Sequence, residues 1–540
     1  MRSLIVVALG LTATFPLAAG SPVAEKSPVA KIIELGKEDN RVMDHLDYLV
    51  NNIGARLTAS DNDVKACEWS RDLFEDWGLE NAKLEEAGSF PVEFNRGPWS
   101  GRMNKPENML LEFGTPAWSA GTDGKVTGPA VLAPKSIDGL DAADFAGAWI
   151  VSERAQGRRN REEQQRQREI QNFLREAGVA GFVSSSGSKY IRVSGRSPRS
   201  FDQIPTIPRI TMLGDHFDKI KAHLEAGTEV ELTFDIRNHF EPGPAVYYNT
   251  VAEITGTEFP DECVIIGGHI DSWDGATGTT DNGCGVAVAM EAARLLMESG
   301  AKPRRTIRFQ LWSGEEQGLL GSRAWIEQNP NLLDGISAVF VYDGGPNAIA
   351  AVNCTNEMLP HFEKALAPIM GLNDMPFEIR PAAVLRSGAG SDHASFIQKG
   401  IPGFFWTQEG RADWRHGIHT QFDTYDLAIP EYMEHSATVV ALAALGVANL
   451  DQKLPRDNIQ SGRGGGGGGG GRRMGVFLDG VAVEEVVPNG VAANAGLKAG
   501  DVFVSIDTQK IENRRGLVRA IQTGEPRKKV KIKRDGKEME

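Results

Sequence analysis

The chain has 540 residues, a length that at roughly 150 residues per domain corresponds to about three or four domains. Hydrophobic residues make up 41% and charged residues 24%, which is typical of a folded globular protein and excludes a disordered, collagenous or coiled-coil chain. The net charge of −14 argues against nucleic acid as a partner, because proteins that bind phosphate backbones carry an excess of basic residues.

The first twenty residues predict an export signal. Arg2 precedes an apolar run over residues 4–17, and Ala18, Ala19 and Gly20 supply a small-residue cleavage site. No later stretch reaches the roughly 18 uninterrupted apolar residues that a membrane span needs. We therefore expect a secreted or periplasmic protein without a membrane span once residues 1–20 are removed, with an uncleaved N-terminal anchor as the alternative.

The rest of the chain divides by pattern. Residues 118–245 hold short apolar strands, among them residues 130–132, and a polar helix over 158–176 whose alternating acids and bases indicate a solvated face. Residues 246–450 alternate apolar strands with amphipathic helices, which indicates an α/β domain with a mostly parallel sheet. A run of eight glycines, residues 464–471, predicts a flexible linker before a separate C-terminal module.

Within the α/β region, metal-type side chains follow the ends of predicted strands. Predicted strands over residues 264–268, 306–312 and 336–342 each run into such a residue, and two further candidates lie on adjoining loops. Because ligands bind outside the carboxyl ends of parallel strands, we expect these side chains to converge. The five candidates are His269, Asp281, Glu316, Asp343 and His419.

Two imidazoles and three carboxylates suit two divalent ions, with zinc as the natural choice and Asp281 bridging them. Two ions about 3.5–4 Å apart lower the pKa of a shared water, and a nearby carboxylate takes its proton. Glu315, beside a ligand, fits this base, and Asp271 is placed to orient the imidazole of His269. No serine or cysteine nucleophile is comparably supported, and Cys284 is interpreted as a packed thiol.

The blocks around these residues resemble the signatures of the di-zinc exopeptidases of clan MH, and within that clan the carboxypeptidase Q family. The likeness extends over roughly residues 30–452 and includes the stretches 52–57 and 249–256. It implies the same roles for the five ligands, Glu315 and Asp271, and a β-rich protease-associated domain inserted over the active-site mouth. The matching blocks are residues 268–274, 280–285, 312–318, 343–345 and 419–424.

Four residues are candidates for contact with the substrate. Asp392 and His393 lie in a block that resembles one near the substrate pocket of the family, and a turn held by hydrogen bonds is the alternative. Arg415 and His416 stand close to His419 in sequence, where they could meet a substrate carboxylate or only line the rim.

The C-terminal module resembles a bacterial-type PDZ domain through residues 474–478, 486–492 and 495–502. The resemblance implies capture of a C-terminal peptide by strand addition, with Met474, Gly475 and Val476 as the peptide-binding loop. A packing or tethering role is the alternative. The expected organisation is a signal peptide (1–20), a peptidase domain in two parts (25–118 and 245–452), the insert (119–244), a linker (453–473) and the PDZ-like domain (474–540).

The sequence thus predicts a secreted zinc exopeptidase that acts on dipeptides or short peptides. Two alternatives stay open: a non-catalytic, receptor-like binding protein on the same fold, and a glutaminyl cyclase, which would use a single zinc. The choice between aminopeptidase and carboxypeptidase or dipeptidase action stays open, as does a homodimer. The four cysteines are too few for a disulfide framework in so long a chain.

Overall fold

The computed structural model describes residues 26–153, 161–387 and 390–460, and beyond residue 475 a set of shorter stretches. The chain forms two compact units, which divide between Ser461 and Gly462. The expected signal peptide and glycine run lie outside the described residues, as do residues 158–160 of the expected polar helix.

The peptidase part of the first unit is built on a mostly parallel sheet, in agreement with the expected α/β class. The strand order is β13-β12-β14-β11-β9-β10-β8. β9 runs parallel to both β10 and β11, and β11 runs parallel to β14. The strands are β8 (Glu231–Ile254), β9 (Phe259–His269), β10 (Arg305–Trp312), β11 (Ile336–Val341), β12 (Ala348–Thr355), β13 (Glu378–Ala382) and β14 (Gly403–Glu409).

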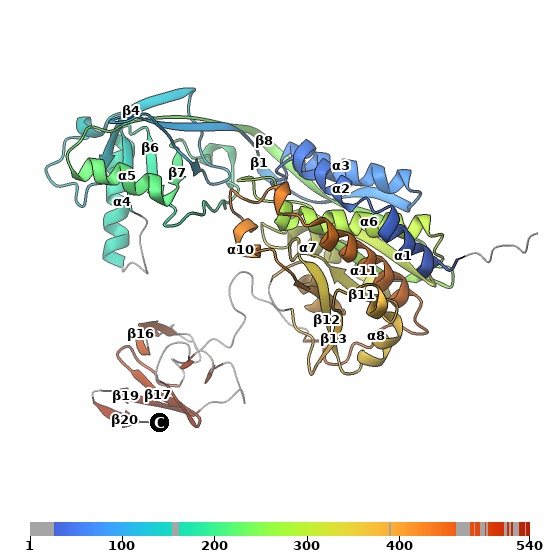
Figure 1. Cartoon of the computed structure of the whole chain (residues 1–540). Coiled ribbons are helices and arrows are strands. Elements are labelled where there is room, and N and C mark those ends of the chain that lie inside the picture. The colour runs from blue at the N-terminus through green and yellow to red at the C-terminus, as the bar shows by residue number, and fades with distance from the viewer. Residues whose placement is uncertain are drawn as a thin grey trace, which may run out of the picture. The chain divides into compact units, whose positions relative to one another are not determined.

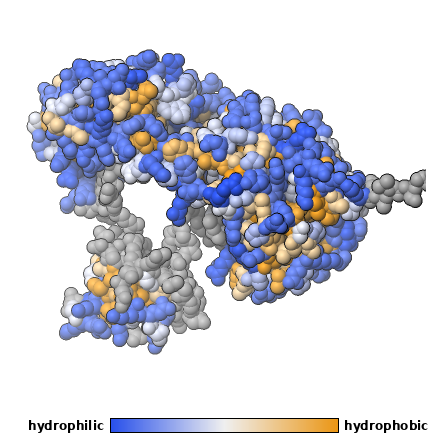
Figure 2. All heavy atoms as spheres, in the orientation of Figure 1, coloured by the Kyte–Doolittle hydropathy of each residue, from blue (hydrophilic) through white to orange (hydrophobic). Residues whose placement is uncertain are grey.

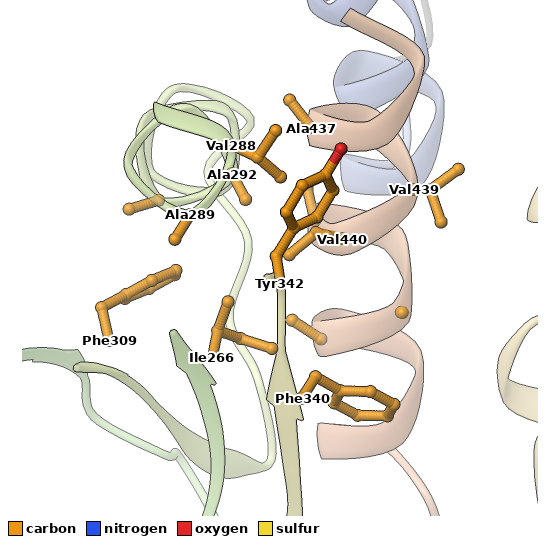
Figure 3. Packing of buried hydrophobic residues seen from close by; sticks show 14 of the residues in the cluster. Ile266, Val288, Ala289, Ala292, Phe309, Phe340, Tyr342, Ala437, Val439 and Val440 are labelled. Atoms are coloured by element: carbon orange, nitrogen blue, oxygen red, sulfur yellow. The ribbon is translucent and has the colours of Figure 1, made fainter. Parts of the chain in front are cut away.

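Helices cover both faces of this sheet. On one face, α6 (Cys284–Glu298) and α11 (Pro430–Ala448) pack against strand residues such as Ile266 and Phe340 (Figure 3). On the other face, Trp325 and Phe396 pack against the sheet from two shorter helices. The remaining α-helices of this part are α1 (Pro28–Glu38), α2 (Val42–Asp47), α3 (Asp61–Asp76), α7 (Leu320–Gln328), α8 (Leu359–Ala365), α9 (His393–Ile397) and α10 (Trp414–Gly417).

A long antiparallel ribbon of β1 (Glu80–Lys105) and β8 leads from the peptidase sheet into an inserted lobe (Figure 1). There the sheet continues through four parallel strands, and Trp149 packs against Phe234 in a separate core. That core also takes in Met103 and Leu111, which precede the expected boundary at residue 119. The lobe contains β2 (Met109–Leu110), β3 (Phe113–Gly114), β4 (Lys125–Leu132), β5 (Trp149–Ser152), α4 (Arg161–Glu176), β6 (Gly181–Ser185), β7 (Arg209–Met212) and α5 (Gly214–Glu225).

The second unit is a small antiparallel sheet with its own core, which includes Phe503, Leu517 and Ile532. Asp501 is buried and accepts a hydrogen bond from Arg534 Nε at 2.6 Å. Val476 begins the first strand, whereas the two preceding residues of the expected peptide-binding loop, Met474 and Gly475, lie outside the described residues. The strands are β15 (Val476–Asp479), β16 (Ala482–Val486), β17 (Val502–Ile506), β18 (Gln509–Lys510), β19 (Val530–Arg534) and β20 (Lys537–Met539).

On the face shown in Figure 2, the described residues are largely hydrophilic, with apolar side chains in smaller patches. Among the described helices, none combines the length and the apolar character that crossing a membrane would require. All four cysteines lie in the described part of the chain, where they are buried and form no disulfide. Burial raises the pKa of the Cys284 thiol well above its ordinary value, which is consistent with a packed, unreactive thiol.

Candidate metal centre

The five predicted ligands meet at the carboxyl edge of the parallel sheet. His269 is the last residue of β9, Glu316 lies in the turn after β10, and Asp343 follows β11. Asp281 comes from the turn η4 (Thr279–Gly283) before α6, and His419 from the loop after α10. Neighbouring parallel strands thus bring residues from a span of 150 positions to one edge.

Their ligand atoms form two groups that share Asp281. In the first group, His269 Nε2 lies 3.1 Å from Asp281 Oδ1 and 3.3 Å from Asp343 Oδ1. In the second, His419 Nε2 lies 2.9 Å from Asp281 Oδ2 and 3.2 Å from Glu316 Oε2. Within each group, all ligand atoms lie within 4.8 Å of one another. Each carboxylate oxygen of Asp281 therefore faces a different group.

The site carries more buried negative charge than its two imidazoles can balance. Burial and the neighbouring Asp281 carboxylate raise the pKa of Glu316 to about 8. Burial also raises the pKa of Glu315 and Asp343 above their ordinary values. In the described part of the chain, Glu316 Oε1 has no hydrogen-bond partner. Divalent cations fit this set of donors, because they supply the missing positive charge and a partner for the free oxygen.

Asp271 contacts both the imidazole of His269 and the turn that carries Glu315 and Glu316. His269 Nδ1 contacts the main-chain oxygen of Asp271 at 3.0 Å and its carboxylate Oδ1 at 3.4 Å. The same carboxylate accepts hydrogen bonds from the main-chain nitrogens of Glu315, at 3.1 Å, and Glu316, at 3.4 Å. Thr58 Oγ1 also donates a hydrogen bond to Asp271 Oδ2, at 2.7 Å. Asp271 thus contacts the imidazole of His269 and also holds the Glu315–Glu316 turn, a contact that was not expected.

Two residues that sequence reasoning did not single out hold the Asp281 turn. Asp423 accepts hydrogen bonds from the main-chain nitrogens of Thr280, at 2.5 Å, and Asp281, at 3.2 Å. The amide side chain of Asn282 donates to Tyr342 O at 2.8 Å and so fixes the turn to the end of β11. Both residues lie inside blocks that carry the family resemblance, which was the only available signal.

The predicted substrate residues occupy different environments. Asp392 is fully buried and His393 is 4% exposed, with its Nε2 2.7 Å from Ser387 O. Arg415 is exposed on α10, and the ring of His416 stacks on Phe422 at 4.6 Å. Arg415 and His416 therefore lie nearer to solvent than the Asp392–His393 pair.

A mostly parallel sheet with a buried, carboxylate-rich candidate metal centre at its carboxyl edge is typical of a metal-dependent enzyme of the α/β class. Comparison with protein families gives a match to peptidase family M28 over residues 249–444 and to a PDZ domain over residues 482–534. The chain belongs to peptidase family M28 and is a metallopeptidase with a PDZ domain.

The relatives of the chain include carboxypeptidase Q of several vertebrates. The mouse protein is 30% identical over 450 residues, a match that covers 80% of this chain and 92% of the relative. Human carboxypeptidase Q is 28% identical with the same coverage. Among solved structures, an M28 peptidase precursor from Shewanella amazonensis superposes with a TM-score of 0.58 at 22% identity, covering 79% of this chain and 97% of that chain. This structural likeness supports the fold.

Proposed function

We propose that this protein is a secreted or periplasmic di-zinc exopeptidase that hydrolyses dipeptides or short peptides. The observation that carries the proposal is the division of ligands into two groups that share Asp281. In this proposal His269 and Asp343 hold one zinc, Glu316 and His419 hold the other, and Asp281 bridges both. The export part rests on residues 1–20 alone.

When bound, the two ions polarise the scissile carbonyl and lower the pKa of the attacking water. Glu315 accepts the proton of that water and returns it to the leaving amine. The hydrogen bond from its main-chain nitrogen to Asp271 fixes the turn that carries this carboxylate. Asp271 thereby positions both the base and the imidazole of His269.

Substrate binding is proposed for two regions. Arg415 and His416 meet a charged end of the peptide at the exposed rim, whereas Asp392 and His393 act from the buried side of the site. The PDZ domain is proposed to bind an extended C-terminal peptide through residues 474–476. The inserted lobe is proposed to limit access to short substrates.

The test compares wild type with Glu315→Gln in two assays, zinc per chain by elemental analysis and release of amino acids from a dipeptide panel. We expect two zinc equivalents in both proteins. Turnover should fall by about 100-fold or more in the variant, because a general base typically contributes a factor of that size.

The matched control is Glu316→Gln, which changes the adjacent residue in the same way. It should lower zinc content as well as turnover, because Glu316 is a proposed ligand. A single zinc in wild type would favour a cyclase, and two zincs without turnover on any peptide would favour a binding protein. Full activity of Glu315→Gln would contradict its role as base.

A further inference from the structure

A five-residue segment of the inserted lobe, residues 189–193, lies along the loop that carries His419. We call this segment the strap. Arg192 pairs with Thr420 as an isolated antiparallel bridge. The main-chain nitrogen of Val193 donates to His419 O at 3.0 Å, and Arg192 Nη1 donates to Ile418 O at 2.6 Å. The backbone on both sides of the His419 side chain is therefore bound by residues that lie over 200 positions earlier in the chain.

Gln421 adds a second set of contacts between the strap and the loop. Its Oε1 accepts a hydrogen bond from the main-chain nitrogen of Ile191 at 2.8 Å. Its Nε2 donates to Lys189 O at 3.1 Å and to Glu112 Oε1 at 3.0 Å. One amide side chain thus satisfies main-chain groups at the start and in the middle of the strap.

Buried side chains fix the strap itself. Ile191 and Val193 are 2% and 4% exposed, and Val193 packs in an apolar cluster with Trp118 and Trp273. The ring of Trp273 in turn contacts the imidazole of His419, with ring centroids 6.2 Å apart. The strap is therefore anchored on the lobe side and also packs close to the metal centre.

His419 needs such support because of its backbone. Its φ angle is +56°, in the left-handed region that residues other than glycine seldom adopt. A conformation of this kind persists only where surrounding contacts hold it. In the described structure, the hydrogen bonds from Val193 and Arg192 act on His419 O and on the carbonyl immediately before it.

We propose that the strap positions His419 for metal binding, so that the inserted lobe sets the affinity of one of the two metal positions. This inference rests on the proposed di-zinc function. Gln421, Arg192 and Val193 are positioning residues, because they bind the strap to the loop that carries His419 and none is a proposed ligand. Loosening the strap should lower the metal affinity of the position formed by Glu316 and His419. The metal affinity of the position formed by His269 and Asp343 should stay unchanged.

The test uses the full chain with Gln421→Leu, which keeps a similar volume and removes all three hydrogen bonds of the side chain. Competition with a zinc chelator measures the affinity of each zinc equivalent. We expect one equivalent to bind about 10-fold or more weakly, the size typical for loss of groups that orient a ligand, and the other to be unchanged. The thermal unfolding midpoint should stay at the wild-type value.

Arg192→Ala is the second variant, with Arg196→Ala as its matched control. Both arginines are exposed in the same stretch, but only Arg192 donates to the His419 loop in the described structure. Arg192→Ala should weaken one zinc equivalent and Arg196→Ala should weaken neither. The inference would be overturned if both zinc equivalents bound with wild-type affinity in Gln421→Leu and in Arg192→Ala. If Gln421→Leu were unstable, the affinities measured in Arg192→Ala would decide.

A measurement on metal-free protein separates this inference from the proposed function. Hydrogen exchange at the Val193 amide should be slow in wild type and faster in Gln421→Leu. Wild-type protein that binds no zinc would defeat the proposed function and, with it, the metal-binding part of the inference. Fast exchange at Val193 in wild type would overturn the strap itself, whatever the zinc content.

Discussion

Arg56 is a buried cation that binds the loop between His269 and the Asp281 turn. Its side chain is fully buried and donates to the main-chain oxygens of Ile270 at 2.7 Å, Gly54 at 2.9 Å, Thr277 at 2.8 Å and Gly278 at 2.9 Å. Burial lowers the pKa of Arg56 to about 10, although the nearby carboxylates of Asp423 and Asp63 oppose the change. The residue therefore stays charged at neutral pH and joins the N-terminal segment to the loop after β9.

We expect Arg56→Met to lower the free energy of unfolding by about 3–5 kcal/mol, the range seen when one partner of a buried charge network is removed. The methionine leaves several carbonyl groups without a donor and the carboxylates without a counter-charge. Urea unfolding followed by circular dichroism measures the change. The comparison is Arg71→Met, since Arg71 is partly exposed and bonds to Asp72; it should change stability by at most about 1 kcal/mol. Equal effects at both positions would contradict the role given to Arg56.

At the scale of elements, α6 is tied to the N-terminal segment through a buried carboxylate. Glu291 is fully buried and accepts hydrogen bonds from Arg294 Nη2 at 2.7 Å and from the main-chain nitrogen of Arg41 at 3.0 Å. His45 Nε2 lies 3.1 Å from its other oxygen. Burial alone would raise the pKa of Glu291, but these hydrogen bonds outweigh it and the pKa lies below its ordinary value.

A lowered carboxyl pKa gives the stability a defined pH dependence. The contribution of Glu291 is fully present above its unfolded pKa of about 4.3 and is lost as the pH falls through the lower folded value. We expect Glu291→Gln to be less stable than wild type at pH 7, by about 1.5–3 kcal/mol for hydrogen bonds to a charged group. The difference should shrink below about pH 4.3. Urea unfolding of both proteins from pH 7 to pH 3 measures it, and a constant difference would argue against this assignment.

At the scale of the whole molecule, the two units have separate cores and the chain divides between them at residue 461. The proposed zinc ligands, Glu315 and the strap all belong to the first unit. We therefore expect a chain that ends at residue 461 to keep the zinc content and dipeptide turnover of the full protein, because domains with their own cores fold independently. Elemental analysis and the dipeptide assay measure this. Loss of zinc on truncation would mean that the PDZ domain supports the metal centre.

Most of the peptidase fold follows from local patterns. The predicted strand over residues 306–312 is observed as β10 (Arg305–Trp312), and the predicted strand over 336–342 as β11 (Ile336–Val341). These elements are buried, so an apolar run of the right period leaves little choice of structure. The start of the lobe has no such local pattern, because β1 is one continuous strand from Glu80 to Lys105 that reaches into the lobe before the expected boundary at residue 119.

The sequence by itself identified the candidate metal ligands and predicted that they would meet, since ligands at the ends of neighbouring parallel strands share one edge. Only the tertiary structure decided how those ligands are held. Asp271 accepts hydrogen bonds from the Glu315–Glu316 turn, and Asp423 accepts them from the Asp281 turn. The strap donates a hydrogen bond to the backbone of His419. The reason is physical: these supports are largely hydrogen bonds to main-chain groups, which every residue carries, so distant partners leave no pattern of residue types to read.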